Sequence, residues 1–237
     1  MITYIKIFLI IIYSTILSAL ALLSALVDRS FYTYFLISKL FSKGVLLISG
    51  VTLKITGLQN VSPAGTYVFV SNHSSQFDIP AIQLAAPVRI SLVYKKEINR
   101  IPLFGWQMMF GPYIVIDRKN AEKALLSLEK AKQLMDTKKI SVHIFAEGTR
   151  SRTGEIQPFK RGAFYLASKV GYPVIPVTIN GGSKILPRGK LNIKSGIMHI
   201  HFDKPIPTSD LHTRQDEMHL METVRNKVIE NYLGVYY

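Results

Sequence analysis

The run from Ile7 to Val27, IFLIIIYSTILSALALLSALV, carries no charged side chain. A helix rises about 1.5 Å per residue, so this run matches the ~30 Å hydrocarbon core of a bilayer. It predicts a membrane helix that either spans the bilayer or enters one leaflet. The alternative is a signal peptide cleaved at Ala19-Leu20-Ala21. The length of the run and a charged flank limited to Lys6 favour the membrane helix.

The next segment, residues 30–51, is largely apolar but includes Ser38, Lys39, Ser42 and Lys43. These four residues recur at helical spacing and form one polar stripe. The pattern predicts a helix in the headgroup region of a membrane, with lysines reaching toward phosphates. A second core helix of the folded domain is the alternative. Residues 1–50 are therefore expected to form N-terminal membrane-associated helices.

The charge balance supports a membrane partner. Twenty-nine Lys and Arg residues against 15 Asp and Glu give a net charge of +14, while 48% of residues are hydrophobic. An excess of this size predicts an anionic partner, and the high hydrophobic content favours a lipid surface over nucleic acid. Arg29, Lys39 and Lys43 follow the first apolar run and only Lys6 precedes it. This asymmetry predicts the cytoplasmic face of the membrane.

The absence of cysteine excludes disulfide scaffolds, thiolate metal sites and a cysteine nucleophile. Three other signatures are also missing: G-x-G-x-x-G, G-x-x-x-x-G-K-[ST] and G-x-S-x-G. A nucleotide-phosphate loop and a serine-elbow hydrolase both lose support as a result.

From Val51 onward, short β-rich runs alternate with helical ones. This alternation predicts an α/β fold, with a mixed, mostly parallel sheet flanked by helices, in one domain over residues 51–237. Pro176 lies inside one of these runs and predicts an edge or bulged strand there. The expected strands are VTLKIT, TYVFVS, VRISLVY, YIVID, ISVHIFA, PVIPVTIN and GIMHIHFD.

The stretch SNHSSQFD, residues 71–78, places His73 five residues before Asp78. The two side chains can meet only if the backbone turns between them, as it does where a strand end feeds a helix. Asp78 could then fix the imidazole tautomer and leave its other nitrogen free as a general base. The alternative is a helix cap, because Ser75 and Asp78 resemble a capping box. The two interpretations are compatible.

The stretch FAEGTRSRTG, residues 145–154, delivers Glu147, Gly148, Thr149 and Arg150 from a strand end into a loop. Glycine permits close backbone approach, and the arginine offers a forked donor for phosphate oxygens. A polar turn with a basic flank is the alternative. Lys160 follows close by.

The stretch YKKEINRIPLFGWQ, residues 94–107, offers Lys96 as a further phosphate contact beside an apolar wall. The alternative is a helix start with a solvated charged face and Trp106 in the core. His199 and His201 share one face of a strand, but no third metal ligand is evident, so a surface or interface face is favoured over a metal site.

These stretches, taken in order, resemble the glycerolipid acyltransferases. NHSSQFD resembles the first motif of that family, KEINRIPLFG the second, FAEGTRSR the third and VIPV the fourth, and ILPRG is typical of bacterial members. The third motif commonly has proline where this chain has Ala146. The resemblance implies that His73 is the base and Asp78 its orienting partner. It also implies that Lys96 and the Glu147–Arg150 loop shape the phosphate site of the acceptor.

The resemblance further implies transfer of a fatty acyl group to the free hydroxyl of 1-acylglycerol 3-phosphate, giving phosphatidic acid. The donor would be acyl-CoA or an acyl-carrier protein, with no bound cofactor and no metal ligand. Two alternatives stay open: another lysolipid acceptor, such as a lysophospholipid or a lyso-ornithine lipid, and a non-catalytic membrane lipid-binding protein. Nucleic acid is not expected as a partner, because no binding module is recognisable.

Overall fold

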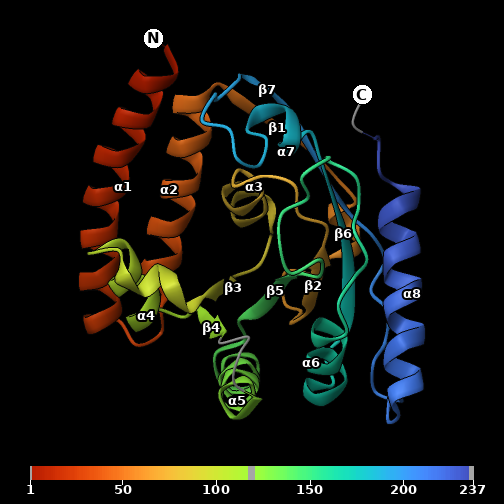
Figure 1. The fold of residues 1–237 in the computed structure, drawn as a ribbon. Helices are drawn as coiled ribbons and strands as arrows, with labels where there is room; N and C mark the ends of the chain where they lie inside the picture. Colours follow the sequence, from red (N-terminus) through yellow and green to blue (C-terminus); the bar gives the residue numbers. More distant parts are fainter. Residues whose placement is uncertain (1, 117–120, 235–237) are drawn as a thin grey trace.

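A single mixed sheet of seven strands organises the molecule (Figure 1). The structure is a computed structural model that describes residues 2–116 and 121–234. The strand order is β1-β7-β6-β2-β5-β3-β4, and among the strands of the described residues only the β6–β7 pair is antiparallel. The predicted mixed, mostly parallel sheet is therefore confirmed. The strands are β1 (Val51–Thr56), β2 (Val68–Ser71), β3 (Ile90–Lys95), β4 (Ile114–Ile116), β5 (Ser141–Phe145), β6 (Val174–Asn180) and β7 (Gly196–Phe202).

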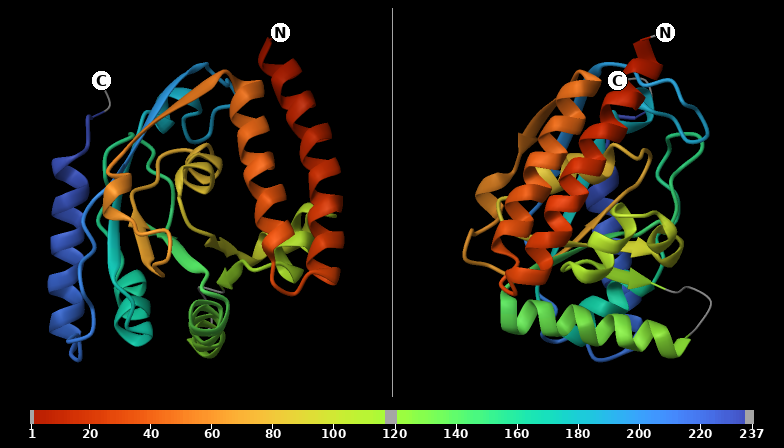
Figure 2. Two further views of the ribbon diagram at one scale, coloured as in Figure 1. Left: turned by 180° about the vertical axis from the view of Figure 1, so that it is seen from behind. Right: turned by 90° about the vertical axis from the view of Figure 1, so that its left-hand side faces the viewer.

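Helices cover both faces of the sheet (Figures 1 and 2). One face packs against α2 and α3, with α1 and α4 outside them, and the other packs against α5, α6 and α8. Strand β2 feeds both cores, because Phe69 points into one and Val68 and Val70 into the other. The helices are α1 (Ile2–Val27), α2 (Tyr32–Ser49), η1 (Leu58–Asn60), α3 (Asp78–Ala85), η2 (Lys96–Arg100), α4 (Phe104–Phe110), α5 (Ala121–Lys138), α6 (Gly162–Val170), α7 (Gly182–Ile185) and α8 (Arg214–Glu230).

Strand β6 bears on the prediction that Pro176 marks an edge or bulged strand. The strand lies between β7 and β2, so the expected edge position is wrong. The Pro176 carbonyl accepts a hydrogen bond from the Asp203 N–H at 3.0 Å, one residue beyond the end of β7. The N–H and C=O of one strand residue point to the same side of the strand. The N–H that Pro176 lacks would therefore point toward the β7 side, at a position where β7 has already ended. An interior strand tolerates proline at that place.

Helix α1 is the one described helix long and apolar enough to cross a membrane, judged by length and composition. Its buried residues are few and small or medium-sized: Leu17, Ser18, Ala21 and Ala25. Side chains on the rest of its surface are largely apolar and exposed. The outer face of α1 therefore has no partner within the described residues.

Helix α2 is a packed helix rather than a one-sided interfacial one. It contacts both α1 and α3, and Ser38 and Ser42 of the expected polar stripe are buried. The Ser38 hydroxyl lies 2.6 Å from the Tyr113 hydroxyl, and the Lys39 ammonium donates to the Ala86 carbonyl at 3.2 Å. The predicted stripe is wrong for the serines, because short hydroxyls can be satisfied inside the core.

Candidate active site

The candidate site lies at one edge of the sheet. Strands β6, β2, β5 and β3 are neighbours and run parallel, so their carboxyl ends meet at that edge. Ligands of open α/β sheets bind at this position. His73 follows β2, Glu147 follows β5, Lys96 follows β3 and Gly182 follows β6. Four segments that are far apart in the sequence thus converge.

His73 and Asp78 are in contact. The His73 Nδ1 atom lies 2.9 Å from Asp78 Oδ2, and the same oxygen accepts hydrogen bonds from the N–H groups of Ser74 at 2.7 Å and Ser75 at 2.8 Å. Asp78 is fully buried at the start of α3. Because a carboxylate only accepts, the Nδ1 atom carries the proton and Nε2 is left as an acceptor.

The predicted capping box is only half formed. Asp78 bonds back to the Ser75 N–H, but the Ser75 hydroxyl donates to the Leu186 carbonyl at 2.9 Å and accepts from the Phe77 N–H at 3.3 Å. The capping carboxylate nevertheless reaches the histidine. The cap and the histidine contact are therefore two functions of one side chain.

The backbone of His73 is held from both sides by the loop after β5. Its N–H donates to Glu147 Oε1 at 2.8 Å, and its carbonyl accepts from the Ser151 N–H at 2.8 Å. The other Glu147 oxygen accepts from Gln157 Nε2 at 2.9 Å. Burial raises the pKa of Glu147 to about 7. With both oxygens bonded and only 2% of the residue exposed, Glu147 is placed to position the His73 backbone rather than to meet a phosphate.

Two aromatic rings support the imidazole of His73. Phe145 stacks on it with ring centroids 3.8 Å apart and planes 17° apart, and His143 meets Phe145 edge-on at 4.5 Å. His143 Nε2 lies 3.0 Å from the Ser71 hydroxyl, and burial lowers the pKa of His143 to about 3, so this second imidazole stays neutral. The motifs did not predict this support, although the alternation of β5 places residues 143 and 145 on one face.

The loop after Glu147 presents basic groups. Gly148 has φ +71°, a conformation that favours glycine, and the Lys160 side chain packs beside it. The Arg150 guanidinium makes no hydrogen bond or ion pair with the described residues. The Arg150 carbonyl accepts from Arg188 Nη1 at 2.6 Å, which brings a second guanidinium to the loop. The Thr149 carbonyl accepts from the side chain of Gln157, at 3.3 Å.

The remaining residues singled out from the sequence lie on η2, on α4 and in the sheet. Lys96 is exposed on η2, and Trp106 is exposed on α4 rather than in the core. His201 Nδ1 lies 2.9 Å from the Thr56 hydroxyl at the sheet. Across residues 2–116 and 121–234, no three His, Cys, Asp or Glu side chains are grouped as metal ligands.

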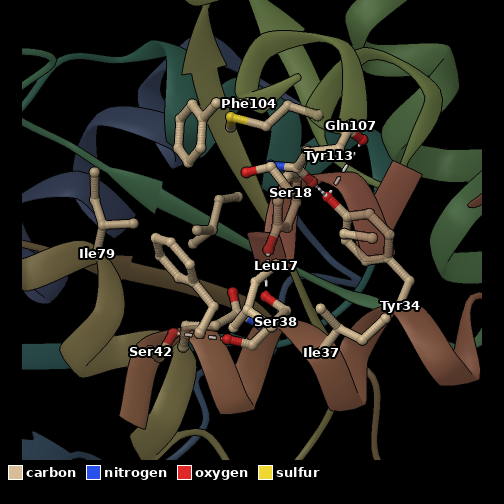
Figure 3. Close-up of a pocket in the computed structure, with 15 residues that line it drawn as sticks. Leu17, Ser18, Tyr34, Ile37, Ser38, Ser42, Ile79, Phe104, Gln107 and Tyr113 are labelled. Atoms are coloured by element: carbon tan, nitrogen blue, oxygen red, sulfur yellow. Dashed lines mark hydrogen bonds between the residues drawn. The ribbon is translucent and has the colours of Figure 1, made fainter. Parts of the chain in front are cut away.

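An apolar slot of about 60 Å³ begins one residue from Asp78, at Ile79 (Figure 3). Its walls come from α1, α2, α3 and α4. Two pairs of its polar groups bond one another: the Tyr34 hydroxyl contacts the Gln107 side chain, and Ser38 contacts Tyr113. An alkyl chain suits such an apolar lining.

Residues 52–180 match the sequence profile of the acyltransferase family. The chain belongs to the acyltransferase family. Three relatives are named 1-acyl-sn-glycerol-3-phosphate acyltransferases. This acyltransferase is 27% identical over 212 residues to that of Saccharomyces cerevisiae, 36% over 179 residues to the chloroplastic BAT2 of Brassica napus, and 29% over 180 residues to the alpha form of Homo sapiens.

The matched regions cover 89%, 75% and 76% of this acyltransferase, but 69%, 50% and 63% of those relatives in the same order. The chain thus spans between half and about two thirds of the curated relatives. Its fold is similar to that of the 1-acyl-sn-glycerophosphate acyltransferase PlsC of Thermotoga maritima. The TM-score is 0.81 at 22% identity, over 97% of this chain and 94% of that one.

Proposed function

We propose that this acyltransferase moves a fatty acyl group from a thioester to the free hydroxyl of 1-acylglycerol 3-phosphate, giving phosphatidic acid. The observation that carries the proposal is the His73–Asp78 contact, which leaves Nε2 as the accepting nitrogen next to the loop that holds the His73 backbone. The names of the relatives supply the acceptor.

His73 is proposed as the general base. Its Nε2 atom takes the proton of the acceptor hydroxyl as that oxygen attacks the thioester carbonyl carbon. The tetrahedral intermediate then collapses, the carbon–sulfur bond breaks, and the proton passes from the imidazolium to the leaving thiolate. Asp78 stabilises the imidazolium while it exists. The acyl group goes directly from sulfur to oxygen, so no residue carries it.

Arg150 is proposed as the main contact for the acceptor phosphate, with Lys96 and the backbone of Gly148 and Thr149 completing that site. A forked guanidinium suits phosphate oxygens. The bonds made by Glu147 support a different role, that of holding the base in place. The same basic surroundings suit a phosphorylated donor, either acyl-CoA or an acyl-carrier protein.

The membrane placement follows from how α1 is held. Near its start, the Thr3 hydroxyl donates to Asn192 Oδ1 at 3.0 Å and the Lys6 ammonium donates to Ser195 Oγ at 3.0 Å. Toward its other end α1 packs against α4 (Figure 2). Because α1 contacts the folded domain near both of its ends, it cannot cross a bilayer without that domain. We therefore propose that residues 1–50 lie in one leaflet with the outer face of α1 among lipid chains, on the cytoplasmic side predicted from the flanking charges.

Two substitutions test the proposal in membranes that carry the protein. His73→Ala should abolish acylation of lysophosphatidic acid, and activity equal to wild type would remove the base assignment. Arg150→Ala should raise the KM for the acceptor far more than the KM for the donor. Acylation of lyso-ornithine lipid but not of lysophosphatidic acid would show that lyso-ornithine lipid is the acceptor. Failure of wild type with every lysolipid would favour a non-catalytic lipid binder.

A further inference from the structure

A second cavity lies away from the proposed active site, between α5, the end of α4 and the turn from α1 to α2. Its volume is about 220 Å³. Apolar walls come from Phe31, Phe110 and Leu134, and Lys130 and Lys138 add two ammonium groups. No carboxylate lines it among the described residues. We call these five residues the basic niche.

Lys130 is the charged group best placed to bind a ligand there. It is partly buried, and it forms no hydrogen bond or ion pair with any residue in the described parts of the chain. Burial lowers its pKa, which means that the ammonium has lost water without gaining a partner. Arg89 adds positive charge next to a lining residue, because its Nη2 atom donates to the Lys138 carbonyl at 2.7 Å. An anion in the niche would offset the lost hydration.

The surface next to the niche is apolar and exposed. Trp106 is 44% exposed, Met109 44% and Phe110 49%, all on α4. Helices α2, α1 and α4 lie side by side on one face of the molecule (Figure 2, right). Helix α4, which carries these exposed apolar side chains, thus lies next to α1, whose surface is also largely apolar and exposed. Tryptophan beside lysines is typical of the boundary between lipid chains and headgroups.

We propose that the basic niche binds the phosphate headgroup of an anionic phospholipid whose chains lie along the exposed side of α4. Free phosphate would use the lysines but not the apolar walls, and a neutral lipid would leave Lys130 without an anion. The site rests on the proposed membrane placement of the N-terminal helices. It does not depend on acyl transfer, so binding and catalysis can fail separately.

Trp106 is the only tryptophan in the chain, so its fluorescence reports on α4 without labelling. The full-length protein is mixed with vesicles of phosphatidylcholine alone or with phosphatidylglycerol added, and binding is measured by co-sedimentation. We expect tighter binding to the anionic vesicles and a blue shift of the Trp106 emission. Equal binding to both vesicle types, or an unshifted emission on vesicles that sediment the protein, would overturn the site.

Lys130→Gln should weaken binding to the anionic vesicles about fivefold or more, from ~1 kcal/mol per lysine near an anionic surface. Lys132→Gln is the matched control, because it removes the same charge from an exposed position on the same helix. Lys130→Arg should bind like wild type, which separates loss of charge from loss of fold. Equal weakening by Lys130→Gln and Lys132→Gln would show general charge attraction only and would refute the niche. Acylation of detergent-dispersed acceptor should stay unchanged in all three variants. A loss of acylation confined to Lys130→Gln would also refute the proposed niche.

Discussion

Replacing Asp78 by asparagine tests the electrostatic part of the proposed mechanism. Asp78 Oδ2 accepts three hydrogen bonds, two from backbone N–H groups and one from His73, whereas Oδ1 is buried with no hydrogen-bond partner among the described residues. Asparagine will therefore place its oxygen at the Oδ2 position and its amide nitrogen at the Oδ1 position. The tautomer of His73 is kept and the negative charge is lost, while the amide adds two N–H donors at the buried Oδ1 position.

The magnitude follows from the geometry. An imidazolium and a carboxylate whose nearest atoms are 2.9 Å apart have charge centres about 4 Å apart, which is worth about 4 kcal/mol at an effective dielectric constant of about 20. That interaction exists only while His73 holds the transferred proton. Its loss should lower kcat about 10³-fold, because each 1.36 kcal/mol of barrier is tenfold in rate.

The assay is steady-state acylation of lysophosphatidic acid at saturating donor. We expect Asp78→Asn to lower kcat with little change in the acceptor KM. Asp78→Ala serves as the comparison: it also strands the N–H groups of Ser74 and Ser75, so its thermal midpoint should fall further than that of Asp78→Asn. A kcat for Asp78→Asn within fivefold of wild type would refute the charge argument.

Three other substitutions probe groups that position the proposed base. Glu147→Gln should flatten the pH dependence of stability. Folding raises the pKa of Glu147 from 4.5 to about 7, so the free energy of unfolding of wild type falls as pH rises through that window. Thermal melts at several pH values measure this dependence, and the same slope for both proteins would contradict the prediction. Gly182→Ala places a Cβ 2.2 Å from Asp78 Oδ1 and should lower kcat at least tenfold. The control Gly162→Ala, whose Cβ meets nothing within 4 Å, should leave kcat unchanged. Equal kcat values for the two variants would show that the Asp78 carboxylate tolerates the added Cβ. Phe145→Leu removes the ring stack and should lower kcat about 2–10-fold, since such a pair is worth ~0.5–1.5 kcal/mol, and an unchanged kcat would count against the support role.

Local pattern was sufficient for much of the fold. Short β-rich runs bounded by polar residues predicted all seven strands, and the apolar run predicted α1. The contact between His73 and Asp78 was also predictable, because a strand that feeds a helix must turn between them. These features depend on residues that are neighbours in the sequence.

Features set by distant parts of the chain were not predictable. The hydrogen bond from the His73 N–H to Glu147 joins residues 74 positions apart, and no periodicity in the sequence indicates it. The sequence predicts that Ser38 lies on the surface, because its contact with Tyr113 forms only in the folded chain. Pro176 predicts an edge strand, and only the position where β7 ends explains why an interior strand can hold it. In each case the missing information was the identity of a remote partner.

The way α1 is held also bears on the order in which the molecule assembles. Among the described residues, the partners of α1 follow it in the chain, from α2 through α4 to Asn192 and Ser195, which lie 189 positions after Thr3 and Lys6. During synthesis α1 leaves the ribosome well before the segments that fix its inner face. Contacts over such separations form late, because a long loop must close first. The apolar helix is thus free to reach a lipid surface while the rest of the chain is still unmade, and the domain would then complete its folding on that surface.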